Sequence, residues 1–97
     1  MNSVKLSGKL VVDSNNSLEN IDYIPFYIYV SRKFQRKGKQ DYDLILCRAF
    51  GNQADMILTK IPIGSKIIVE GVWETDIREK NGKRIIRNYC SVTNIEN

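Results

Sequence analysis

Residues 31–50 bring positive charges and aromatic rings together within a short stretch of the chain. Five basic side chains crowd its first half: Arg32, Lys33, Arg36, Lys37 and Lys39. Phe34 stands among them, and Tyr42, Arg48 and Phe50 follow in the second half. Cations neutralise a line of phosphates, and flat rings stack on unpaired bases. The combination predicts a site for a single-stranded polynucleotide, although the charge alone would also fit a solvated loop.

A second basic cluster lies at residues 78–87, and each cluster holds five of the 15 lysines and arginines in the chain. The formal net charge is +4, and clustered positive charge is typical of proteins that bind polyanions. Arg84 and Arg87 could instead pair with Glu79 or Asp76 across a hairpin, and such exposed pairs contribute little. Besides the five basic residues of the first cluster, the predicted phosphate contacts are Arg48, Arg78, Lys80, Lys83 and Arg84.

The residues that most enzymes and metal sites need are missing from this sequence. It has no histidine, and its two cysteines, Cys47 and Cys90, stand far apart, which argues against a zinc site and an imidazole base. We expect both to be reduced thiols buried in strands. Asp41 and Asp43 alone are too few to hold a metal ion. The sequence therefore predicts neither an enzyme nor a protein that needs a cofactor or metal.

No segment of the sequence indicates insertion into a membrane or export. No apolar run approaches the roughly 20 residues that cross a bilayer. The N-terminus lacks the basic and apolar regions of a signal peptide. We expect a cytoplasmic protein whose 97 residues form a single domain with a small core.

Strand patterns dominate the elements that must position these side chains. Alternating apolar residues predict strands at 4–12, 25–31, 42–50, 65–77 and 84–95. Apolar residues at Ala54, Ile57, Leu58 and Ile61 predict a helix at 51–61, and a polar loop is predicted at 13–20. Each of Gly8 and Gly71 predicts a bend or bulge, and Asn81-Gly82 predicts a tight hairpin.

The alternation in strand 42–50 predicts which side chains face outward. Arg48 resists full burial, so Leu44, Leu46 and Phe50 should share its outer face, where exposed apolar groups suggest a covered surface. Phe50 could alternatively pack against the helix that follows it.

Strands 25–31 and 65–77 carry further rings. Tyr27 and Tyr29 share one face and are predicted either to stack on bases or to line a subunit interface. Trp73 has the parity of Ile67 and Val69, which favours a place in the core over a place in a binding site.

The predicted order is three strands, a helix and two further strands. Five short strands with glycine bends, and a helix between the third and fourth, fit the all-β OB fold, a five-stranded Greek-key barrel. Both basic clusters then fall on loops that join strands. In such barrels these loops flank the surface where oligonucleotides commonly bind. We therefore expect the charges and the rings to converge.

Four segments of the chain resemble bacterial single-stranded DNA-binding proteins (SSB). The opening "NSVKLSGKLVVD" resembles the family's N-x-V-x-L-x-G-x-L segment, and "FYIYVSRKF" resembles its second strand. "DLILCRAFGNQAD" is similar to its third strand and helix, and "IIVEG" to its fourth strand. The matches run in order along nearly the whole chain. The resemblance implies an OB fold and sequence-independent binding of single-stranded DNA in replication, recombination or repair.

The resemblance also implies roles for particular residues. Phe34 and Phe50 occupy positions where the family places base-stacking aromatics. Leu44 stands where Trp or Phe is usual, and Arg78 replaces another aromatic, so two stacking rings are missing. Three tyrosines are predicted to compensate for them: Tyr27, Tyr29 and Tyr42.

The family usually forms homotetramers, so the resemblance implies a homo-oligomer, with a dimer as the alternative to a tetramer. The family also usually carries a flexible tail with an acidic tip, whereas this sequence ends at Asn97. We interpret it either as a chain from which the tail was removed or as a short form, such as one from a phage or mobile element. Two other functions remain open: a PriB-like primosome or protein-interaction module with weak nucleic-acid binding, and an RNA-binding OB domain.

Overall fold

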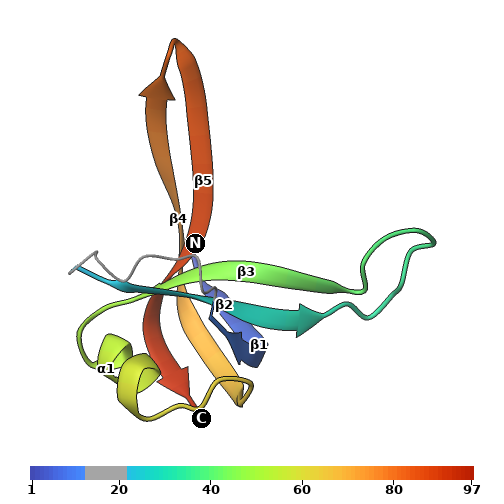
Figure 1. The fold of residues 1–97 in the computed structure, drawn as a ribbon, viewed down its shortest axis with the longest axis vertical. Helices are drawn as coiled ribbons and strands as arrows, with labels where there is room; N and C mark the ends of the chain where they lie inside the picture. The colour runs from blue at the N-terminus through green and yellow to red at the C-terminus, as the bar shows by residue number, and fades with distance from the viewer. Residues whose placement is uncertain (13–21) are drawn as a thin grey trace.

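The computed structural model describes residues 1–12 and 22–97, which form five strands and one helix (Figure 1). In chain order these are β1 (Val4–Val11), β2 (Ile24–Ser31), β3 (Tyr42–Ala49), α1 (Gly51–Thr59), β4 (Lys66–Lys80) and β5 (Lys83–Glu96). The loop predicted at 13–20 lies outside the described residues.

The five strands close into a barrel in the order β1-β2-β3-β5-β4. All neighbouring pairs are antiparallel except β3 and β5, which run parallel. The predicted five-stranded barrel, with its helix between the third and fourth strands, is confirmed. The closing strand, β1, changes partner along its length, because it pairs with β4 from Val4 to Lys9 and with β2 from Lys9 to Val11.

The two predicted glycine bends lie where backbones come close. A Cβ on Gly8 would overlap the backbone oxygen of Tyr29, at the point where β1 passes from β4 to β2. A Cβ on Gly71 would overlap the backbone oxygen of Ser91, and the register of β4 on β5 shifts between Glu70 and Gly71. The predicted bulge at Gly71 is therefore confirmed, and both positions require the smallest residue.

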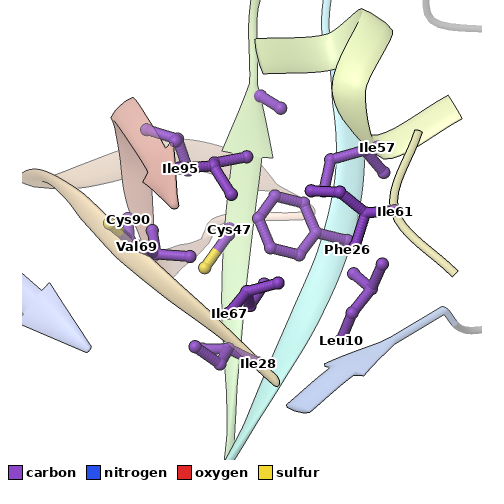
Figure 2. Close-up of a cluster of buried hydrophobic side chains, with 12 residues drawn as sticks. Leu10, Phe26, Ile28, Cys47, Ile57, Ile61, Ile67, Val69, Cys90 and Ile95 are labelled. Atoms are coloured by element: carbon purple, nitrogen blue, oxygen red, sulfur yellow. The ribbon is translucent and has the colours of Figure 1, made fainter. Parts of the chain in front are cut away.

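Alternate residues of the strands fill the barrel interior. Figure 2 shows Phe26 near the centre, with Cys47 from β3, Ile67 from β4 and Leu10 from β1 around it. Helix α1 contributes Ile57 to this cluster. The inward side chains come from every strand, and burying them is the main force that closes the barrel.

Both cysteines lie in this core, as the sequence predicts, and carry free thiols. Cys47 and Cys90 are register partners across the parallel β3–β5 pair. A hydrogen bond with Cys90, together with burial, raises the pKa of the Cys47 thiol. The raised pKa keeps this thiol protonated and unreactive.

The helix is shorter than predicted, and one residue of its apolar stripe is not buried. α1 ends at Thr59, where the backbone N–H groups of Lys60 and Ile61 both donate to the Met56 carbonyl. Ile57 and Ile61 are buried, but Leu58 is 54% exposed, so its predicted place in the stripe is wrong. A nine-residue helix on a barrel end buries only a narrow strip of its surface.

Two β-hairpins project from the barrel in different directions (Figure 1). Residues 32–41, between β2 and β3, form the basic arm, which a hydrogen bond from the Arg32 N–H to the Asp41 carbonyl closes at its base. Residues 73–88, the outer parts of β4 and β5, form the ribbon. Asn81 and Gly82 at its tip have φ of 52° and 75°, the positive values that the predicted tight turn requires.

Trp73 corrects one prediction, because it is 42% exposed and does not lie in the core. It has the inward parity of Ile67 and Val69, but the ribbon continues beyond the end of the barrel, where no core remains to cover it.

Among the described residues, no helix is long and apolar enough to span a membrane.

Candidate nucleic-acid interface

The outer surface of β2 and β3 carries a row of rings that we call the ring face. The register pairs Tyr29 with Leu44 and Tyr27 with Leu46, so these side chains project on the same side of the sheet. Their neighbours Cys47 and Ala49 are fully buried, which confirms that Arg48, Leu44 and Phe50 lie on the outer side. The ring face consists of Tyr23, Tyr27, Tyr29, Tyr42, Leu44 and Phe50.

Two tyrosines stack at the end of the ring face next to the basic arm. The Tyr29 and Tyr42 rings lie 4.9 Å apart between centroids, with 16° between their planes. They are diagonal neighbours across β2 and β3, because Tyr29 pairs with Leu44, two residues after Tyr42. Leu44 is exposed beside them. This pair forms a preformed aromatic platform with an apolar side chain at its edge.

Phe50 and Tyr23 lie at the other end of the ring face. Phe50 is the N-cap of α1 with an extended backbone, so its ring stays outside the helix and is 40% exposed. The Tyr23 ring lies 5.9 Å from it and is tilted by 53°. The sequence analysis did not identify Tyr23, although it has the parity of Tyr27 and Tyr29. It lies just before the predicted strand, and the alternation was not extended to it.

Arg48 packs on two aromatic rings, Tyr23 of the ring face and Tyr89 of β5, rather than projecting into open solvent. Its guanidinium carbon is 3.7 Å from the centroid of the Tyr89 ring and 4.5 Å from that of Tyr23. Its Nη2 donates to the Asp76 carboxylate at 2.8 Å, and only 14% of its side chain is exposed. A predicted phosphate ligand thus packs on two rings and is paired with an acid.

The residues around Arg48 also shift the pKa of Tyr89, a residue that the sequence analysis did not identify. Burial, above all, raises the pKa of Tyr89, and the carboxylates of Glu74 and Asp76 raise it further, whereas Arg48 opposes them. The phenol therefore stays neutral. No local pattern marks Tyr89, because its partner comes from β3 and the contact exists only in the closed barrel.

The basic arm presents its charges in open solvent, except for one. Arg32 donates two hydrogen bonds to Asp43, at 3.0 and 2.7 Å. This contact lowers the pKa of the Asp43 carboxyl and raises that of Arg32. Phe34 is 83% exposed. The other four predicted phosphate contacts of the arm are also exposed: Lys33, Arg36, Lys37 and Lys39.

The ribbon has two faces, and the register assigns its charges to them. Lys80 pairs with Lys83, Arg78 with Ile85, and Asp76 with Arg87, so these residues share one face, which we call the outer ribbon face. Tyr89 pairs with Glu74 on that face and contacts Arg48, so the outer ribbon face continues into the ring face.

Arg84 lies on the other side of the ribbon. It pairs with Glu79 and alternates with the residues of the outer ribbon face, so the register separates it from the other predicted phosphate contacts. Arg87, which the predicted set left out, takes its place beside Arg78. Both line a hollow of about 260 Å³. Asp76 forms its ion pair with Arg48 and not with Arg87, so the alternative pairing of Asp76 across the hairpin is wrong.

A larger hollow, of about 940 Å³, lies away from most of the rings. Its lining comes from β1, β2, β4, the basic arm and the end of the chain after β5, and it includes Lys9, Lys33 and Lys66. Tyr29 is the one aromatic residue in the lining. Size alone therefore does not mark the interface, because stacking on bases needs several rings and this hollow offers one.

The structure places most of the predicted rings on one face of the barrel, and the two basic segments adjoin the two ends of that face. The ring face joins the basic arm at Tyr42, where β3 begins, and the outer ribbon face at Arg48, near its end. Phe34 and Phe50 both point away from the core. Arg84 is outside this surface, and the guanidinium groups of Arg32 and Arg48 are engaged by carboxylates.

Comparisons with known proteins agree with this fold. The barrel matches the crystal structure of a small single-stranded DNA-binding protein from Streptomyces coelicolor, with a TM-score of 0.68 and 13% identity over 97% of this chain and 91% of that one. It also matches a Plasmodium falciparum SSB in complex with ssDNA, with a TM-score of 0.77 and 15% identity over 99% and 93% of the two chains. At these identities the matches establish the OB fold alone.

Comparisons of the sequence identify the family to which the chain belongs. A single-stranded DNA-binding protein of Fusobacterium nucleatum is 36% identical over 101 residues, which cover 99% of this chain and 66% of that protein. The model of the single-strand binding protein family matches residues 1–96. With this match over almost its whole length, the chain belongs to the single-strand binding protein family.

Proposed function

We propose that this protein binds single-stranded DNA without regard to sequence. Bases stack on the ring face, and phosphates contact the exposed cations of the basic arm and the outer ribbon face. The observation that carries the proposal is the ring face, on which the Tyr29–Tyr42 stack and Phe50 lie between two groups of exposed cations. Rings and cations are the two features that recognise an unpaired strand irrespective of its sequence.

The residues divide into two roles within this proposal. The proposed stacking residues are Phe34, Phe50, Tyr27, Tyr29 and Tyr42. The proposed phosphate contacts are Lys33, Arg36, Lys37, Lys39, Arg78, Lys80, Lys83 and Arg87. Neither Arg78 nor Arg87 has an ion-pair partner among the described residues, so both are free to exchange counterions for phosphate.

Family membership supports the biological setting that we propose. The protein acts in the cytoplasm as a homo-oligomer, on single strands exposed during replication, recombination or repair. The matched family comprises DNA-binding proteins rather than enzymes, in line with the absence of histidine from the sequence. Stacking and counterion release both operate without chemistry on the DNA.

The test is a fluorescence anisotropy titration with an end-labelled dT oligomer at several salt concentrations. Phe34→Ala and Phe50→Ala should each weaken binding by about 1–3 kcal/mol, the usual cost of losing one stacked base. The dependence on salt should stay the same, because neither ring carries charge. Ile63→Ala is the matched control, since this side chain is apolar and exposed but belongs to the connection between α1 and β4 and not to the ring face.

Two results would contradict the proposal. The first is a parent protein that does not bind the oligomer even at low salt. The second is a pair of phenylalanine variants that bind as tightly as the parent and the Ile63→Ala control. The first result would reject the function, and the second would reject the site.

A further inference from the structure

Arg48 contacts three other segments of the molecule. Its hydrogen bond to Asp76 reaches β4, its stacking on Tyr89 reaches β5, and its stacking on Tyr23 reaches the segment before β2. The residue itself belongs to β3. One guanidinium therefore joins the ring face to the base of the ribbon.

The ribbon has few other ties to the barrel. Beyond Trp73, the β4 and β5 strands pair only with each other, and most of their side chains are exposed. At the edge of β4, the Asn2 side chain exchanges two hydrogen bonds with the Trp73 backbone, at 2.7 and 2.8 Å. The Arg48–Asp76 pair is the one ion pair among the described residues that reaches further out along the ribbon.

The geometry also argues against a direct contact between Arg48 and phosphate. The Asp76 carboxylate already neutralises the guanidinium, and the Tyr23 and Tyr89 rings both lie within stacking distance of it. A guanidinium in this setting gains more from its planar stacking and its paired acid than a lysine would, because its donors form a rigid fork. Replacing the acid by phosphate would leave Asp76 unpaired beside a polyanion.

We propose that Arg48 is a positioning residue: it fixes the ribbon at a set orientation to the ring face, so that one DNA strand reaches both surfaces. Arg78 and Arg87 then contact phosphates while Phe50 stacks on a base. Without the Arg48–Asp76 contact, which we call the tie, the ribbon moves independently of the barrel. Binding of DNA must then also fix the ribbon, and the lost conformational entropy weakens the affinity. This inference rests on the proposed function, because it assigns the preorganisation of the same site.

The test removes each partner of the pair while keeping its shape. Arg48→Gln and Asp76→Asn should each weaken dT oligomer binding by about tenfold, measured at a temperature where both variants are folded. The slope of log affinity against log salt should stay at the parent value for Arg48→Gln. Glu74→Gln is the matched control, since it removes one carboxylate from the same ribbon face without touching the pair, and it should not weaken binding.

Three outcomes would overturn the proposal. If Arg48 were a phosphate ligand, Arg48→Gln would lower the salt slope by about 0.7. Under the same alternative, Asp76→Asn would bind more tightly than the parent, because it would free the guanidinium. If the pair served stability alone, both folded variants would bind like the parent.

A measurement without DNA separates this inference from the proposed function. Amide hydrogen exchange at the ribbon base, at residues 74–77 and 86–89, should be faster in Arg48→Gln than in the parent. Unchanged exchange there would overturn the tie even if the protein binds DNA. A parent that does not bind the oligomer would reject the proposed function, while the exchange comparison would still report on the tie.

Discussion

Arg78→Ala and Arg87→Ala should each flatten the salt dependence of single-stranded DNA binding, whereas Arg84→Ala should leave it nearly unchanged. All three residues lie on the same ribbon and carry the same charge. They differ in the face to which the register assigns them, because Arg78 and Arg87 share the outer ribbon face and Arg84 lies on the other. The comparison therefore tests geometry and not net charge.

The expected magnitude follows from counterion release. Each lost phosphate contact should lower the log–log salt slope by about 0.7 for a single strand. Losing both Arg78 and Arg87 should lower it by about 1.4. Between about 50 and about 200 mM salt, the parent should lose about sevenfold more affinity than the double variant. Arg84→Ala should differ from the parent by far less than one contact.

The assay is anisotropy of a labelled dT oligomer, titrated with each variant at four or more salt concentrations. Thermal unfolding of each variant confirms that it is folded at the temperature of the titration. Three equal reductions in slope would refute the reasoning, because they would show that the ribbon attracts DNA by total charge irrespective of face. A larger reduction for Arg84→Ala than for the other two would show that DNA follows the opposite face.

Three further predictions concern the ring face and the elements that support it. Leu44→Trp should tighten oligomer binding by about 1–3 kcal/mol, since it adds an exposed ring beside the tyrosine stack, whereas Leu58→Trp on the helix should not. Gly8→Ala should lower the free energy of unfolding in denaturant melts by about 1–3 kcal/mol, because its methyl group would overlap the Tyr29 backbone; no loss of stability would refute the close approach. The pKa of Asp43 is lowered in the folded state, so its contribution to stability is present above the unfolded pKa of about 3.9 and is lost as pH falls through the folded value. The difference in melting temperature between the parent and Asp43→Asn should therefore shrink below about pH 4, and a constant difference would contradict the pairing.

Local patterns were sufficient for the barrel and for the orientation of the ring face. Alternation with a period of two assigns β3 one face for Cys47 and another for Arg48, whatever the partners of the strand are. The Asn81-Gly82 pair fixes a two-residue turn, because both residues must adopt positive φ. These features depend on neighbours in sequence, so the sequence alone predicts them.

The faces of the ribbon were also within reach of the sequence, although the prediction grouped its cations by proximity. A two-residue turn at Asn81-Gly82 pairs Lys80 with Lys83, and counting outward then pairs Glu79 with Arg84. This count separates Arg84 from Arg78. The signal existed, but it appears only when the turn is converted into a register.

Other features depend on how far each strand extends and on contacts between distant segments. Trp73 follows the inward alternation, yet the alternation does not reveal where the barrel ends and the ribbon leaves it. The Arg48–Asp76 pair joins residues 28 positions apart, and no spacing rule connects them. The predicted phosphate role for Arg48 rested on its charge alone, and its acid and rings come together only after the barrel closes.

The most direct test of the central claim is a map of backbone amide chemical shifts during titration with a short dT oligomer. The account predicts shifts at Tyr29, Tyr42 and Phe50 on the ring face, in the basic arm, and on the outer ribbon face at Arg78 and Arg87. Shifts confined to the β1 and β4 residues that line the larger hollow, or to the ribbon face that carries Arg84, with the ring face and the basic arm unchanged, would contradict it.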